Sequence, residues 1–138
     1  MSQTITSDKL YSLTVQIADF CYEIAADLSD DEKYPVQFTL KTNAFEITNH
    51  VAEALGSVDP RDAFWKLGLT KRNLFSVRNT LQQSHKREIL ALNPEIMIKI
   101  NEAIDETNRR IEQSKKMIAG YFEILDADTY KAKGTLSL

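Results

Sequence analysis

Apolar residues recur at spacings of three and four along most of the chain, in four stretches separated by Pro, Gly, Asp and Asn. This spacing is typical of one apolar face on an α-helix. The sequence therefore predicts four helices. Their apolar stripes are Leu10, Leu13, Ile17, Phe20, Cys21, Ile24 and Leu28; Leu40, Ala44, Ile47, Val51 and Leu55; Ala63, Leu67, Thr70, Leu74, Val77 and Leu81; and Met97, Ile100, Ile104, Thr107, Ile111, Ser114, Ile118, Tyr121 and Leu125.

Each stripe follows residues that favour a helix start. Ser7 is the predicted N-cap of the first helix, with Asp8 in its first turn, and Pro35 suits an early helical position because it has no N–H to leave unbonded. Asp59-Pro60 and Asn93-Pro94 predict a cap followed by a first helical residue. Gly56, just after the second stripe, is the predicted left-handed C-cap.

The connections between these stretches are short, which places successive helices antiparallel. We therefore expect an all-α, antiparallel up-down four-helix bundle over residues 8–126. Residues 1–7 are expected to form a flexible N-terminus and residues 127–138 a flexible C-terminal tail. The strict three-four alternation of the fourth stripe predicts that it packs inside the bundle as far as Leu125.

Three of the predicted helices carry aromatic residues away from their apolar stripes. Several such residues together are typical of a subunit interface, so we expect a homo-oligomer. The alternative is that broad stripes pack into one wide core. The predicted interface residues are Tyr11, Tyr22, Phe38, Phe45, Phe64, Trp65 and Phe75.

Composition favours one globular domain: the 138 residues are 43% hydrophobic and 27% charged. No apolar run reaches the length of a membrane span, and the first residues lack the pattern of a secretory signal, so a cytoplasmic protein without membrane association is expected. The single Cys21 lies among apolar neighbours and is expected to be a buried, reduced thiol.

Positive charge is concentrated in one segment of a chain whose net charge is −3. Residues 61–88 carry seven basic and two acidic residues, and Lys71 and Arg78 share a helix flank with Phe64 and Phe75. Phosphates could bind the cations, and unpaired bases could stack on the rings. Alternatively, the cations pair with acidic residues of the first and fourth helices. The charge cluster comprises Arg61, Lys66, Lys71, Arg72, Arg78, Lys86 and Arg87.

No phosphate loop, CxxC pair, HExxH or GxSxG motif is present, so we expect a non-catalytic protein without cofactor. Glu46, His50 and Glu53 share one side of the second helix, but a second copy of such a motif, which a bundle di-metal site needs, is missing. We expect no metal there, and we expect His50 either to make a local hydrogen bond or to face an interface. His85 and the acidic run 30–32 are expected to be solvated.

The segment Leu40–Ala54 resembles the second helix of the four-helix-bundle family typified by the 23S rRNA intervening-sequence protein. That helix has a leucine, two basic residues, small residues and an Asn-Ile-Ala-Glu-Gly-like end; here Lys41 is the only basic residue and Ala54 stands at the Gly position. Residues 62–81 resemble its third helix. Tyr34-Pro35 and residues 38–40 look like the helix-two entry of a member of this family, the accessory variability determinant of diversity-generating retroelements.

This resemblance implies a ring-shaped homopentamer that, in the retroelement branch, binds a reverse transcriptase and its template RNA through a basic surface. Lys41, Lys71 and Arg78 are the positions that it carries over as nucleic-acid contacts. Arg72, Lys86 and Arg87 join them on charge clustering alone. The sequence leaves RNA and DNA both open. The alternative function is a protein-only scaffold whose apolar second faces bind itself or another protein without nucleic acid.

Overall fold

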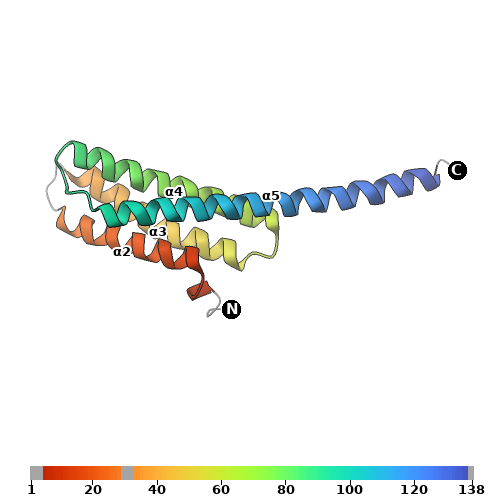
Figure 1. The fold of residues 1–138 in the computed structure, drawn as a ribbon, viewed down its shortest axis with the longest axis horizontal. Helices are drawn as coiled ribbons and strands as arrows, with labels where there is room; N and C mark the ends of the chain where they lie inside the picture. The colour runs from red at the N-terminus through yellow and green to blue at the C-terminus, as the bar shows by residue number, and fades with distance from the viewer. Residues whose placement is uncertain (1–4, 29–32, 137–138) are drawn as a thin grey trace.

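The computed structural model describes the backbone of residues 5–28 and 33–136, and the side chains as far as residue 124. This part of the chain is helical and contains no strand. Its long helices are α2 (Lys9–Asp27), α3 (Tyr34–Gly56), α4 (Pro60–Lys86) and α5 (Pro94–Leu136) (Figure 1). The acidic run 30–32 lies outside the described residues.

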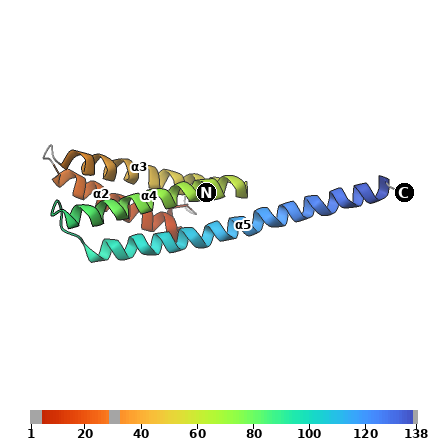
Figure 2. The ribbon, with the colours of Figure 1, turned by 90° about the horizontal axis from the view of Figure 1, so that it is seen from above.

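Consecutive helices run antiparallel and close a four-membered ring, which confirms the predicted four-helix-bundle fold (Figures 1 and 2). α2 lies against α3 and α5, and α4 lies against the same two neighbours, whereas neither diagonal pair brings Cα atoms within 8 Å of each other in the described residues. The stripes meet along the bundle axis, where side chains such as Ile17, Ile47, Leu74 and Ile100 are fully buried. Burial of this core stabilises the fold.

Side-chain caps begin three of the helices. Asp59 accepts a hydrogen bond from the backbone N–H of Arg61, and Asn93 accepts one from Glu95 at 2.8 Å, as predicted. The prediction for the first helix was wrong by one residue. Asp8, not Ser7, is the N-cap: its carboxylate accepts from the N–H groups of Leu10 and Tyr11.

The left-handed helix end is not at the predicted residue. Gly56 is the last residue of α3 and has no positive φ, and the following Ser57 is extended. Instead, Glu88 after α4 adopts a φ of 61°. The N–H of Ile89 bonds to the carbonyl of Ser84, and that of Glu88 to the carbonyl of His85. This is the Schellman arrangement, which glycine usually occupies.

Helix α5 is 43 residues long and its partners are 19 to 27 residues long. At 1.5 Å per residue it exceeds α4 by roughly 24 Å, so its C-terminal part projects beyond the bundle (Figure 1). Regular helix continues past residue 126 to Leu136. The expectation that the stripe is buried to its end was wrong, because Tyr121, beside the start of α4, is 52% exposed.

Polar residues within the core find partners inside it. Thr107 is fully buried and its hydroxyl donates to the carbonyl of Ala103 at 2.7 Å. Cys21 is a buried free thiol, as predicted, and desolvation raises its pKa to about 12. It therefore stays protonated and unreactive at neutral pH. None of the described helices combines the length and apolar character that crossing a membrane requires.

Candidate functional site

The basic segment forms the outward face of α4, and most of its cations have no acidic partner. Arg61 pairs with Asp59, and Lys66 pairs with Glu53 of α3. The remaining five lie more than 4.0 Å from every carboxylate in the described part of the chain; they are Lys71, Arg72, Arg78, Lys86 and Arg87. Pairing with acids of the first and fourth helices, the alternative raised by the sequence, is therefore not seen for these five.

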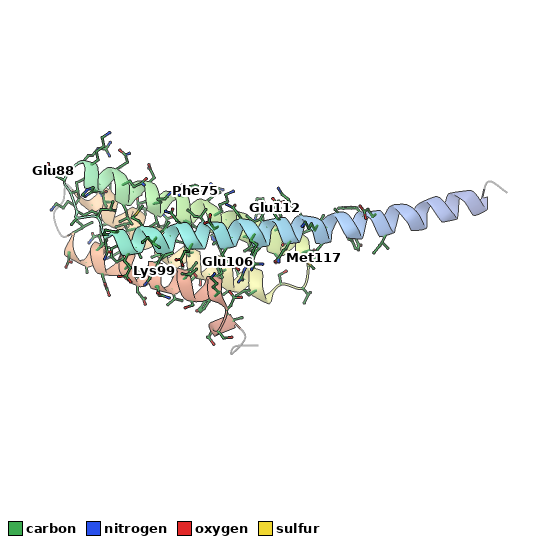
Figure 3. All side chains as sticks on the ribbon, viewed as in Figure 1. Phe75, Glu88, Lys99, Glu106, Glu112 and Met117 are labelled. Atoms are coloured by element: carbon green, nitrogen blue, oxygen red, sulfur yellow. The ribbon has the colours of Figure 1, made fainter. Side chains whose placement is uncertain are left out.

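An exposed aromatic ring lies between two of these cations. Phe75 is 39% exposed and sits midway along α4 (Figure 3). The guanidinium carbon of Arg78 lies 4.7 Å from the ring centroid, and the Lys71 ammonium lies 5.9 Å from it. Arg78 also donates to the neutral side chain of Asn101 on α5 at 3.0 Å, which fixes its position without cancelling its charge. The result is a ring flanked by cations.

A small pocket lies one to two turns nearer the start of α4. It has a volume of about 250 Å³ and lies between α4 and α5. Trp65, which is 63% exposed, and Arg72 are seven residues apart and so share one helix flank, with Gly68 between them. A Cβ built on Gly68 would meet no atom within 4 Å. Glycine inside a helix costs about 1 kcal/mol relative to alanine, and local packing does not require it here.

The other predicted nucleic-acid contacts lie apart from this face. Lys86 and Arg87 are exposed at the C-terminal end of α4, roughly 21 Å along the helix from Arg72. Lys41 is exposed on α3, about 160° around that helix from Asn43, which faces α4. The structure therefore brings together Lys71, Arg72 and Arg78, and leaves Lys41 on a separate surface.

A polar network that the sequence did not predict joins α3 to α4. The amide nitrogen of Asn73 donates to Asn43 Oδ1 and to Glu46 Oε2, both at 2.9 Å. Because a carboxylate can only accept, the oxygen of Asn73 must face His50, whose Nδ1 lies 2.8 Å away. His50 therefore donates from Nδ1. Asn43 also donates to Ser76 Oγ at 3.1 Å, so the network fixes the two helices relative to each other.

Glu46, His50 and Glu53, which the sequence analysis considered as a metal site, all have protein partners in the structure. His50 makes a hydrogen bond, but not the predicted local one, because its partner Asn73 belongs to the neighbouring helix. Glu46 binds Asn73, and Glu53 pairs with Lys66 and raises the pKa of that lysine. Within residues 5–28 and 33–124, the His, Cys, Asp and Glu side chains form no group of three placed to hold a metal ion.

The aromatics predicted to lie in an oligomer interface divide into two sets. Tyr22, Phe38, Phe45, Trp65 and Phe75 are exposed, with Phe45 reaching 65%. Tyr11 and Phe64 are half-buried, and Tyr11 packs against the core. Tyr34 is also exposed and stacks near Phe38 with ring centroids 6.2 Å apart. Sequence reasoning had read Tyr34 only as a helix-entry residue.

Further exposed apolar residues belong to α5 and were not predicted. Met117 lies where α5 leaves the bundle (Figure 3). Tyr121, Phe122 and Ile124 follow it on the projecting part of the helix. Tyr121 belongs to the predicted apolar stripe, so the sequence signal alone could not separate it from core residues, whereas Met117, Phe122 and Ile124 lie off that stripe.

A partly buried ionic network, with Glu106 at its centre, connects the start of α2 to α5, away from the basic face. Arg110 donates to Asp8 at 2.9 Å and to Glu106 at 3.0 Å, and Arg109 also donates to Glu106. Glu106 is only 8% exposed. The hydrogen bond from Arg109, and then that from Arg110, outweigh the cost of burial and lower the pKa of Glu106 to about 2.

Fold and site together define an all-α four-helix bundle with one basic, aromatic-bearing outer helix. Known protein families, curated proteins and solved structures were compared with the chain, and none matches it. The function is therefore inferred from the charge and geometry of α4.

Proposed function

We propose that this protein is a non-catalytic accessory protein that binds nucleic acid through α4 and assembles with copies of itself. The observation that carries the proposal is the exposed ring of Phe75 between Arg78 and Lys71, neither of which has a carboxylate partner among the described residues. Phosphate oxygens would occupy the positions of the missing carboxylates, and an unpaired base would stack on the ring.

The negative net charge confines this binding to one helix. The chain as a whole carries −3, whereas residues 61–88 carry five more basic than acidic residues. A polyanion is repelled by the acidic first third of the sequence and attracted to α4, so the strand follows that helix. Such binding is strongly dependent on salt.

The resemblance to the intervening-sequence family gives this proposal its specific form. The partner would be a retroelement reverse transcriptase with its template RNA, and the assembly would be a ring of five. The four-helix fold and the basic third helix of the bundle are compatible with that form. RNA and DNA remain alternatives for the strand.

The test is a salt titration of binding to single-stranded RNA and DNA. The double variant Lys71→Gln/Arg78→Gln removes two phosphate contacts, and the slope of log K against log salt should become shallower by about 1.4. The matched control is Lys99→Gln/Lys115→Gln, which removes two α5 lysines already paired with Glu95 and Glu112. An unchanged slope in the first variant, or an equal change in both, would contradict the proposal.

Assembly has its own supporting observation, which also favours the alternative of a protein-only scaffold. Phe38 and Phe45 are both more than half exposed on α3, and Tyr34 lies beside Phe38. Rings this exposed are stabilised when another surface covers them. Light scattering should give a multiple of the 15.7 kDa chain mass, and Phe45→Asp should reduce it to the monomer. Ile98→Asp, at an exposed apolar residue near the start of α5, is the control and should leave the mass unchanged.

The two functions are separated by combining these measurements. Under the scaffold alternative the chain oligomerises and retains neither RNA nor DNA at low salt. Under the proposed function, charge removal on α4 abolishes retention and leaves the oligomer intact.

A further inference from the structure

We infer that the pocket over Gly68 binds one unpaired nucleobase, with the indole of Trp65 against the base and the guanidinium of Arg72 on its phosphate. This inference rests on the proposed function and names the part of the strand that α4 recognises. It also gives Trp65 a role different from the predicted oligomer interface.

The lining of the pocket suits a flat ring that carries an anion. Five of its six residues offer apolar surface, and Arg72 is the single charged member. The pocket has no carboxylate, and Arg72 has no ion partner in the described part of the chain. Its volume of about 250 Å³ lies below the roughly 300–1,000 Å³ of sites for drug-sized ligands, which suits one ring system. The lining residues are Phe64, Trp65, Gly68, Leu69, Arg72 and Ile111.

Gly68 keeps this space open. It lies in the interior of α4, where glycine destabilises a helix relative to alanine, and nothing lies within 4 Å of the position of its absent Cβ. Packing against α3 or α5 therefore does not explain the glycine. Any larger side chain would occupy the gap between Trp65 and Arg72, which the base would otherwise fill.

Charge decides between a nucleotide and a side chain from another copy of this protein. An aromatic side chain could cover Trp65, but it brings no anion for Arg72. A nucleotide supplies both the flat face and the phosphate. The cations of α4 continue beyond the pocket to Lys71 and Arg78, so the strand that enters the pocket meets further positive charge at Phe75.

Trp65 is the single tryptophan of the chain, so its fluorescence reports on this pocket alone. Oligouridylate and oligothymidylate should quench the emission by stacking, whereas inorganic polyphosphate should bind α4 without quenching it. Gly68→Leu fills the pocket and should weaken oligonucleotide binding about tenfold while leaving polyphosphate binding unchanged. The matched control is Gly120→Leu on α5, also a helical glycine with nothing within 4 Å of an added Cβ, which should leave both unchanged.

The outcomes separate this inference from the proposed function. If oligonucleotides bind without quenching and equally well to Gly68→Leu, the pocket assignment is overturned, whereas nucleic-acid binding through α4 is retained. Emission that changes with protein concentration rather than with oligonucleotide places Trp65 between copies of the chain and also overturns the assignment. If neither polyphosphate nor oligonucleotide binds, both proposals fail.

Discussion

Helices α4 and α5 carry similar numbers of basic residues and use them differently. On α5 as far as residue 124, four of the five cations pair with carboxylates, mostly three or four residues away on the same helix. On α4 and its exit, five of seven have no such partner among the described residues. The acids of residues 61–88 stand near its two ends, at Asp62 and Glu88, where they cannot reach the middle of the helix.

This contrast shows that available charge depends on spacing more than on count. A carboxylate three or four residues from a cation on a helix is its neighbour and competes with any external anion. In the middle of α4, the residue four positions after Lys71 and three before Arg78 is Phe75. On α5, glutamates occupy positions at this spacing from the cations. The middle of α4 therefore offers a ring and two free cations to a ligand.

The largest expected effect comes from giving α4 the pattern of α5. Phe75→Glu places a carboxylate four residues after Lys71 and three before Arg78, and it removes the stacking ring. Nucleic-acid affinity should fall at least about 30-fold, because a stacked base contributes about 2 kcal/mol and both cations are neutralised as well. Fluorescence anisotropy measures the loss. Phe75→Leu removes the ring without adding charge and should lose less; an equal loss in both variants would mean that neutralising the cations is irrelevant.

Removing a carboxylate that pairs with the α5 cations should lower the stability of the fold and leave nucleic-acid binding unchanged. Glu106→Gln removes the negative charge and one of the two acceptor oxygens that Arg109 and Arg110 bind, so the free energy of unfolding should fall by about 2 kcal/mol. Urea denaturation followed by circular dichroism gives this value. Glu112→Gln on the same helix removes only an exposed pair and should cost less than about 0.5 kcal/mol (Figure 3). Equal losses in the two variants would refute a special role for the partly buried network.

The same network predicts an acid dependence. Hydrogen bonds from Arg109 and Arg110 lower the pKa of Glu106 from 4.5 to about 2 in the folded protein. The unfolded chain therefore takes up this proton first as the pH falls. The stabilisation is complete above about pH 4.5 and is lost progressively as the pH approaches 2. Denaturation curves at several pH values should show this slope, and Glu106→Gln should remove its share of it.

The smallest effect concerns the end of the basic helix. Glu88→Gly relieves a left-handed residue at the Schellman position and should raise the free energy of unfolding by about 1 kcal/mol. It also removes the acid nearest Arg87, so nucleic-acid binding should tighten slightly. Glu102→Gly, at an exposed position of α5 inside the bundle, should have the opposite sign and destabilise by about 1 kcal/mol. Destabilisation by both glycines would show that the backbone of Glu88 is not strained.

Two helix N-caps were predicted correctly from short sequence motifs. Asp59-Pro60 and Asn93-Pro94 begin helices in the structure because a cap needs only the side chain and the next turn. Gly56 and Glu88 show the limit of this reading. The favoured residue for a left-handed helix end is glycine, yet the left-handed residue is Glu88, where the N–H groups of Glu88 and Ile89 bond back to the last turn of α4.

The polar network between α3 and α4 had no signal in the sequence. Asn43 and Asn73 are thirty residues apart, and each alone reads as an ordinary polar helix residue. Gly68 likewise appears in the sequence as a weak helix position and becomes part of a pocket only when Trp65, Arg72 and Ile111 are placed around it.

By itself, the sequence determined four amphipathic helices, their buried stripes and the excess of positive charge on the third, because hydrophobic period and charge count are properties of neighbouring residues. Only the tertiary structure decided which cations have no acidic partner, where α5 extends beyond the other helices and which aromatic side chains are exposed. Those outcomes depend on which helix lies beside which and on where each one ends, and no local pattern encodes the distance between side chains on different helices.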